Sequence, residues 1–132
     1  MLVKTFMKIS IIFTISLFLL SCNSNLQQKI TGKWEMKTVK DLGTDVSAQH
    51  NPKNNRWVEF NKNGTFKSGG DPYGENTGKW SFNEQEILFI DSDAGEDDDS
   101  YWQVKISKDT MIWQGMKFDF AKRFEIIHQK IE

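Results

Sequence analysis

The sequence predicts an all-β fold, a single eight-stranded antiparallel up-and-down barrel. Short runs of aromatic and β-branched residues alternate with Gly, Asn, Asp and Pro after residue 30, a pattern typical of strands joined by turns. No window in this part of the chain has the apolar period of a helix. Since the turns are short and no helix covers the apolar face, a meander that closes on itself is favoured. A sandwich of about seven strands is the alternative.

Residues 1–21 have the layout of a secretory signal. Two lysines precede an apolar segment over 9–20, which is shorter than the roughly 20 apolar residues that span a bilayer. The segment Leu19-Leu20-Ser21-Cys22 contains the only cysteine and resembles a bacterial lipobox. The resemblance implies cleavage before Cys22 and acylation of that residue, and two or more acyl chains hold a protein durably on a membrane. The alternative is an ordinary leader followed by a buried free thiol.

Charge and cysteine content exclude several classes of protein. The formal net charge is −1, and no concentrated basic surface is apparent, so nucleic acid is not expected as a partner. With Cys22 acylated, no thiol remains for a disulfide, a thiolate metal site or a cysteine nucleophile. We expect a signal peptide over 1–21, the lipidated cysteine and a short polar tether over 22–29, and one barrel domain over 30–132.

Eight segments of the barrel domain are predicted to be strands. They are short, apolar on alternate residues, and bounded by turn residues. In chain order they cover 32–39, 55–61, 65–69, 77–83, 86–91, 100–107, 110–116 and 120–130.

Three hairpins predict a register. A three-residue loop with Gly64 in the left-handed conformation joins two aromatic residues on one face and two opposite charges on the other. Two-residue turns at 84–85 and 108–109 also give coherent apolar faces. The predicted pairs are Phe60 with Phe66, Glu59 with Lys67, Phe82 with Ile87, Trp80 with Phe89, Ile106 with Met111 and Val104 with Trp113.

The alternation assigns one face of every strand to the barrel interior. A barrel of eight strands either fills with its own side chains or holds one small ligand, and the residues leave both alternatives open. The residues predicted to face inward, and to contact any ligand, are Trp34, Met36, Phe60, Phe66, Trp80, Phe82, Phe89, Val104, Trp113 and Phe124.

The first predicted strand opens with Gly32-Lys33-Trp34, and Gly-x-Trp at this place resembles the first-strand signature of lipocalins. The run from 30 to 130 is similar to the lipocalin-like domains of bacterial lipoproteins. The resemblance implies that Trp34 closes the narrow end of the barrel and that Arg123, from the last predicted strand, lies across it. The chain departs from the family pattern in lacking a Thr-Asp-Tyr motif and a C-terminal helix beside the barrel.

Several polar segments are candidate sites. The loops 40–55 and 69–76 are either a lid or binding rim, or ordinary loops. The acidic run 91–99 begins like a calcium loop, but Trp102 stands where the twelfth-position glutamate belongs, so we expect a solvated hairpin tip and no metal. The two histidines, His50 and His128, lack the spacing of a metal pair, and no nucleophile or phosphate motif is present. No catalytic residue and no cofactor are therefore expected.

These observations together predict a lipocalin-like lipoprotein of the outer membrane, anchored by acyl chains on Cys22 and facing the periplasm. Asn23 supports this location, because an aspartate at that place retains lipoproteins at the inner membrane in many gram-negative bacteria. We expect a small hydrophobic ligand in or at the mouth of the barrel. The alternative is a solid barrel whose loops bind or inhibit another envelope protein. Fold alone does not decide, whereas an apolar void of roughly 300 Å³ or more favours the ligand.

Overall fold

The structure, a computed structural model, describes residues 22–132. The predicted signal peptide and the lipobox residues before Cys22 lie outside the described residues. None of the helices in the described range is long and apolar enough to cross a membrane.

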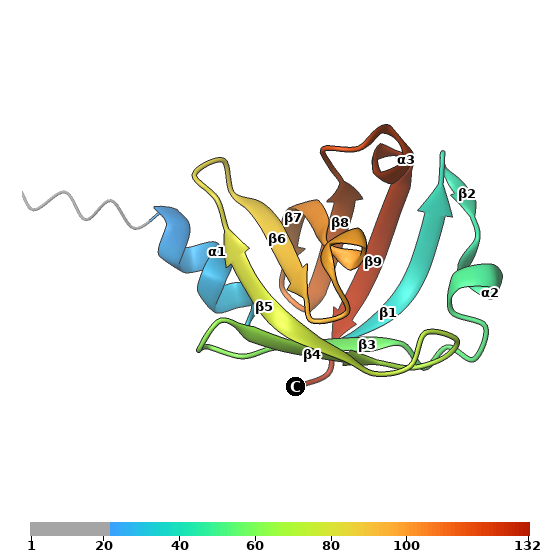
Figure 1. Ribbon diagram of the computed structural model, residues 1–132, viewed down its shortest axis with the longest axis horizontal. Helices are drawn as coiled ribbons and strands as arrows, with labels where there is room; N and C mark the ends of the chain where they lie inside the picture. The colour runs from blue at the N-terminus through green and yellow to red at the C-terminus, as the bar shows by residue number, and fades with distance from the viewer. Residues whose placement is uncertain (1–21) are drawn as a thin grey trace, which may run out of the picture.

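Eight antiparallel strands close into a barrel, as predicted (Figure 1). Each strand pairs with the next one along the chain, and the last strand pairs with the first. A short additional strand, β2 (Thr44–Asp45), pairs with the end of β1 and lies outside this ring. The closed ring excludes the sandwich alternative. The eight strands are β1 (Gly32–Asp41), β3 (Trp57–Phe60), β4 (Thr65–Gly69), β5 (Asn76–Phe82), β6 (Ile87–Ser92), β7 (Ser100–Ser107), β8 (Thr110–Gly115) and β9 (Phe124–Lys130).

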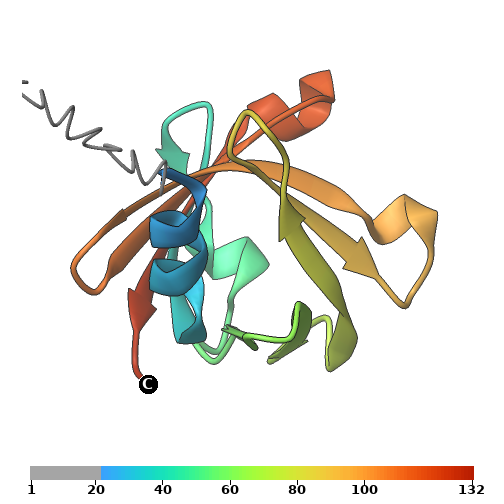
Figure 2. The same ribbon diagram turned by 90° about the vertical axis from the view of Figure 1, so that its left-hand side faces the viewer.

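The helices are short and lie at the two ends of the barrel. The longest, α1 (Cys22–Ile30), is at one end, and Figure 2 shows it in front of the strands. The segment 22–29, predicted to be a polar tether, is therefore helical. Leu26 and Ile30 lie one turn apart, and both pack against the core. The remaining helices are α2 (Ser47–His50), η1 (Glu96–Asp98) and α3 (Asp119–Lys122).

Two of the three predicted registers are confirmed. Phe60 pairs with Phe66 across the β3–β4 turn, where Gly64 has a φ of 84°. Val104 pairs with Trp113 between β7 and β8. In both hairpins the apolar side chains share the inward face, as the alternation requires.

The predicted register between β5 and β6 is wrong by one residue. Trp80 pairs with Ile90, and Phe82 pairs with Leu88. The loop contains three residues, because Glu86 adopts a left-handed conformation with a φ of 60°. The Asn83 side chain stabilises this wider loop by accepting hydrogen bonds from two backbone N–H groups within it, those of residues 85 and 87.

The one-residue shift changes which face of β6 is apolar and buried. Leu88 and Ile90 point inward, and Phe89 lies on the outer face of the barrel. There Phe89 stacks on Tyr101 of β7, with ring centroids 4.8 Å apart. Phe89 therefore does not contribute to the barrel interior, contrary to the sequence prediction.

We call the end of the barrel beside α1 the closed end, and its interior is filled. Trp34 is fully buried there, and its indole Nε1 donates a hydrogen bond to the Ile30 carbonyl at 2.8 Å. Phe60 and Trp80 meet edge to face, with centroids 5.5 Å apart. Leu88, Met111 and Ile30 complete this fully buried layer.

Trp34 closes this end of the barrel, but Arg123 does not lie across it. Arg123 forms a bidentate ion pair with Asp41, at 2.8 and 2.9 Å, at the far end of β1. The cation over the Trp34 ring is Lys130, whose Nζ is 5.5 Å from the ring centroid. Because Lys130 pairs with Trp34 across β1 and β9, whereas Arg123 precedes β9, the strand register explains the correction.

Candidate functional site

The half of the barrel away from α1 contains a pocket of about 690 Å³. We call this the open end, and it is bordered by the loops before β3, between β4 and β5, and between β6 and β7. Its volume lies within the range of about 300–1,000 Å³ that is typical of small-molecule sites. Its walls are largely apolar and include Val39, Val58, Phe66, Ile90, Trp102 and Ile126.

The predicted inward-facing residues divide between the pocket and the filled core. Met36, Phe66, Trp113 and Phe124 line the pocket. The remaining members of the set lie elsewhere, since Phe82 is only partly buried against the core and Phe89 is outside. The members buried in the core without lining the pocket are Trp34, Phe60, Trp80 and Val104. The interior is thus solid at one end and hollow at the other.

The two predicted polar loops meet at the open end. Asn55, from the first loop, donates to a carboxylate oxygen of Asp71 at 2.8 Å and accepts the Asp71 backbone N–H at 2.9 Å. Lys53 also lies 3.5 Å from the same carboxylate. The hydrogen bond from Asn55, followed by the charge of Lys53, lowers the pKa of Asp71. Because exposed ion pairs contribute little to stability, the main effect of these contacts is to hold the two loops together as one rim.

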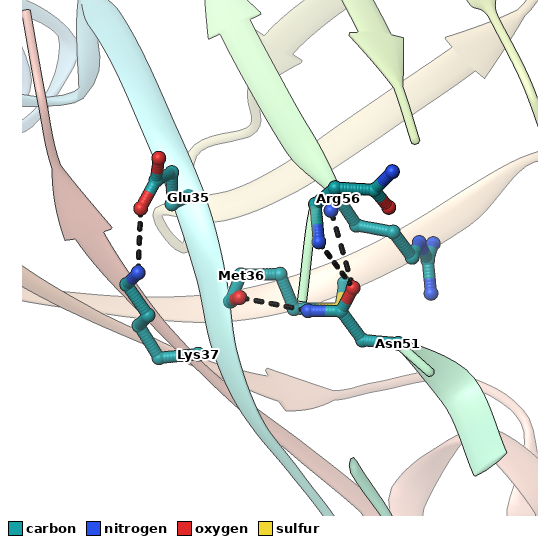
Figure 3. A network of polar contacts seen from close by, with 6 residues as sticks. Glu35, Met36, Lys37, Asn51 and Arg56 are labelled. Atoms are coloured by element: carbon teal, nitrogen blue, oxygen red, sulfur yellow. Dashed lines mark hydrogen bonds and ion pairs between the residues drawn. The ribbon is translucent and has the colours of Figure 1, made fainter. Parts of the chain in front are cut away.

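Asn51 holds the start of β3 in place (Figure 3). Its buried side-chain amide donates to the Met36 carbonyl at 2.9 Å, and its oxygen accepts the backbone N–H groups of Asn55 and Arg56, each at 3.1 Å. The pairing of β1 with β3 ends at Glu35 and Trp57, so the Met36 carbonyl, one residue further along β1, is available to this side chain. One buried amide therefore positions Arg56 against the barrel wall.

Arg56 lines the pocket, and its positively charged side chain is half-buried there. Its Nη1 donates to the His50 carbonyl at 3.0 Å, and its guanidinium carbon lies 4.6 Å from the centre of the Tyr73 ring. No carboxylate of residues 22–132 lies within 4.0 Å of its nitrogens. Burial lowers the pKa of Arg56, but an arginine stays protonated in proteins, so the guanidinium remains a cation.

His128 and Trp113 contribute buried ring nitrogens to the largely apolar pocket wall. Their ring centroids are 4.4 Å apart, and both side chains are buried. Within the described range, neither His128 Nδ1 nor Trp113 Nε1 has a hydrogen-bond partner. Burial, with a smaller contribution from the charge of Arg56, lowers the pKa of His128 to about 3. His128 is therefore neutral at physiological pH, and two side chains that line the pocket each keep one buried nitrogen without a hydrogen-bond partner.

The acidic run forms the tip of the β6–β7 connection, as predicted. Asp98 accepts hydrogen bonds from the Ser92 hydroxyl at 2.7 Å and the Asn76 amide at 3.0 Å, and Asp99 accepts the Ser92 backbone N–H at 2.8 Å. These carboxylates serve as caps of the turn. Across residues 22–132 no group of three or more His, Cys, Asp or Glu side chains is arranged to hold a metal ion.

Three residues of the site were not predicted from the sequence. Asn51 lies in an irregular loop, where no periodicity indicates a direction for its side chain. Arg56 lies in the predicted strand 55–61, but its charge argues against an inward-facing position. The spacing of His128 from His50 does not suggest a metal pair and gives no other indication of a site. Its signal was present, however, because Phe124, Ile126 and His128 alternate along the last strand.

The comparisons with known proteins agree with this architecture. Residues 30–113 match the model of a family described as a lipocalin-like domain. The crystal structure of a DUF4847 family protein from Bacteroides vulgatus ATCC 8482 is similar, with a TM-score of 0.56 and 12% identity, over 79% of this chain and 96% of that one. At this identity the likeness shows the fold alone. A comparison with curated proteins finds no match.

Proposed function

The chain belongs to the lipocalin-like domain family, and from this premise we propose that it binds a small hydrophobic molecule in the pocket at the open end of the barrel. The observation that carries the proposal is the pocket of about 690 Å³ with its largely apolar walls. Removal of an apolar molecule from water into such a pocket supplies the driving force. The hollow half favours this function over that of a solid barrel acting only through its loops.

We also propose that Cys22 is acylated and anchors the protein to the outer membrane, with the domain in the periplasm. The lipobox resemblance and Asn23 support this location. Since α1 begins at Cys22 and lies away from α2 and β2 (Figure 1), the mouth of the pocket would face away from the anchoring membrane. Metabolic labelling with a radioactive fatty acid tests this part: label on Cys22 supports it, and an unlabelled Cys22 rejects it.

The ligand proposal is tested by titrating the protein with N-phenylnaphthylamine, a neutral dye that fluoresces in apolar surroundings. We expect saturable binding at one site per chain. Ser68 of β4 lines the pocket, so Ser68→Trp fills part of it, and a steric cost of about 1–3 kcal/mol weakens dye binding by about fivefold to a hundredfold.

Lys67→Trp is the matched control, because Lys67 is exposed on the outer face next to Ser68. This variant adds the same side chain to the same strand and is expected to bind the dye like the parent protein. Absence of saturable binding by the parent, or equal binding by both variants, would contradict the proposed function.

A further inference from the structure

Among the residues that the structure describes, the pocket wall contains one cation without a carboxylate partner and two side chains that each have an unsatisfied buried nitrogen. Arg56 is a cation without a carboxylate within 4.0 Å. Trp113 Nε1 is a buried donor without an acceptor, and His128 Nδ1 is also unpartnered. Buried charges in proteins are usually paired, so a half-buried cation in a pocket points to an anionic partner from outside the chain.

These three residues belong to one continuous stretch of wall. The Met36 backbone N–H donates to the Arg56 carbonyl at 2.9 Å, and Met36 also pairs with His128 across β1 and β9. The His128 ring in turn packs on Trp113 of β8. Arg56 and His128 are thus separated by the width of one strand, with Trp113 next to His128.

The charge of this stretch is positive. His128 is neutral and adds no charge, so the guanidinium of Arg56 dominates. The two carboxylates that line the pocket come from other loops. Asp98 is engaged by Ser92 and Asn76, and Glu75 is exposed on the rim. The part of the wall that Arg56 forms is therefore suited to a negative group.

We propose that the ligand is an amphipathic molecule with a single anionic head group, which Arg56 binds. The inference rests on the proposed function and specifies its ligand class. A guanidinium is a donor only, and donors of this kind bind a carboxylate or a phosphate oxygen. The apolar body of the ligand would lie on Val58, Phe66 and Ile90.

The test compares three molecules with the same ten-carbon chain: decanoate, decyl phosphate and decanol, each below its micelle-forming concentration. Their affinities are measured by displacement of the dye and by calorimetry. Because hydrogen bonds to charged groups are the stronger ones, we expect at least one of the two anions to bind about tenfold or more tightly than decanol. The preferred anion identifies the head group as carboxylate or phosphate.

Arg56→Gln is expected to abolish this preference. Arg56→Lys keeps the charge and is expected to retain part of the preference. Lys105→Gln is the charge-matched control, since Lys105 is exposed on β7 away from the pocket lining, and it should behave like the parent. If Arg56→Gln does not fold, the comparison of the three ligands on the parent protein and on Arg56→Lys still decides.

The outcomes separate the two proposals. Binding of none of the dye, the anions and decanol rejects the proposed function and the inference together. Decanol binding as tightly as both anions, or an anion preference that survives in Arg56→Gln, overturns the inference and leaves the proposed function standing.

Discussion

Replacing Trp34 by alanine is expected to lower the free energy of unfolding by about 4 kcal/mol, within the range of about 3–5 for buried tryptophan or phenylalanine truncations. Trp34 is fully buried at the closed end, and its indole N–H holds the Ile30 carbonyl. The substitution leaves a cavity inside the closed end of the barrel and also removes the hydrogen bond that joins β1 to α1. Since small domains are stable by about 5–15 kcal/mol, this single change removes a large share of the total.

Phe89→Ala is the matched control for this prediction. Phe89 is an aromatic residue on the outer face, stacked on Tyr101, and its loss is expected to cost about 1 kcal/mol. Urea denaturation of both variants, followed by circular dichroism, measures the two values. If Trp34→Ala costs no more than Phe89→Ala, then Trp34 does not close the barrel as described.

Lowering the pH from 7 to 5 is expected to reduce the free energy of unfolding by about 2 kcal/mol through His128 alone. The pKa of His128 is about 3 in the folded protein, against 6.5 for the unperturbed side chain. As the pH falls below 6.5, His128 becomes protonated in the unfolded chain, whereas the buried ring in the folded protein stays neutral. The stabilisation is therefore complete above about pH 7, and it decreases as the pH approaches 3.

Histidine variants isolate this effect. His128→Gln is expected to remove the loss between pH 7 and pH 5, whereas His50→Gln, which changes the other histidine of the chain, should preserve it. The pKa values of Asp45 and Asp71 are lowered, chiefly by hydrogen bonds from Ser47 and Asn55 respectively. Their contributions are lost only at lower pH, below the chosen window. A parent protein whose stability is constant between pH 7 and pH 5 would contradict the burial of a neutral His128.

The fold could be predicted from the sequence because the alternation of apolar residues in strands and the residue types in turns depend on neighbouring residues only. Gly64 fixed a hairpin loop that the structure reproduces, and the eight strand segments agree with the observed strands to within a few residues. The β5–β6 register was missed because its loop places Glu86 in the left-handed conformation, where a glycine would have marked the position.

Only part of the candidate site could be predicted from the sequence. Alternation identified Met36, Phe66, Trp113 and Phe124 as inward-facing, but it does not reveal how far along the barrel the side chains fill the interior. Asn51 and Arg56 depend on a loop that folds back over β1, a tertiary contact with no sequence period. The role expected of Arg123 came from a family resemblance, and the register of β9 gives that place to Lys130.

The central claim is that a ligand enters the hollow half of the barrel and leaves the filled half untouched, and NMR of the five tryptophan indole N–H groups tests it most directly. On saturation with N-phenylnaphthylamine, the signal of Trp113, which lines the pocket, is expected to shift. The signals of Trp34 and Trp80, whose N–H groups bond to the carbonyls of Ile30 and Asn61, should stay in place. An unchanged Trp113 signal at saturation, or shifts confined to Trp34 and Trp80, would contradict the account.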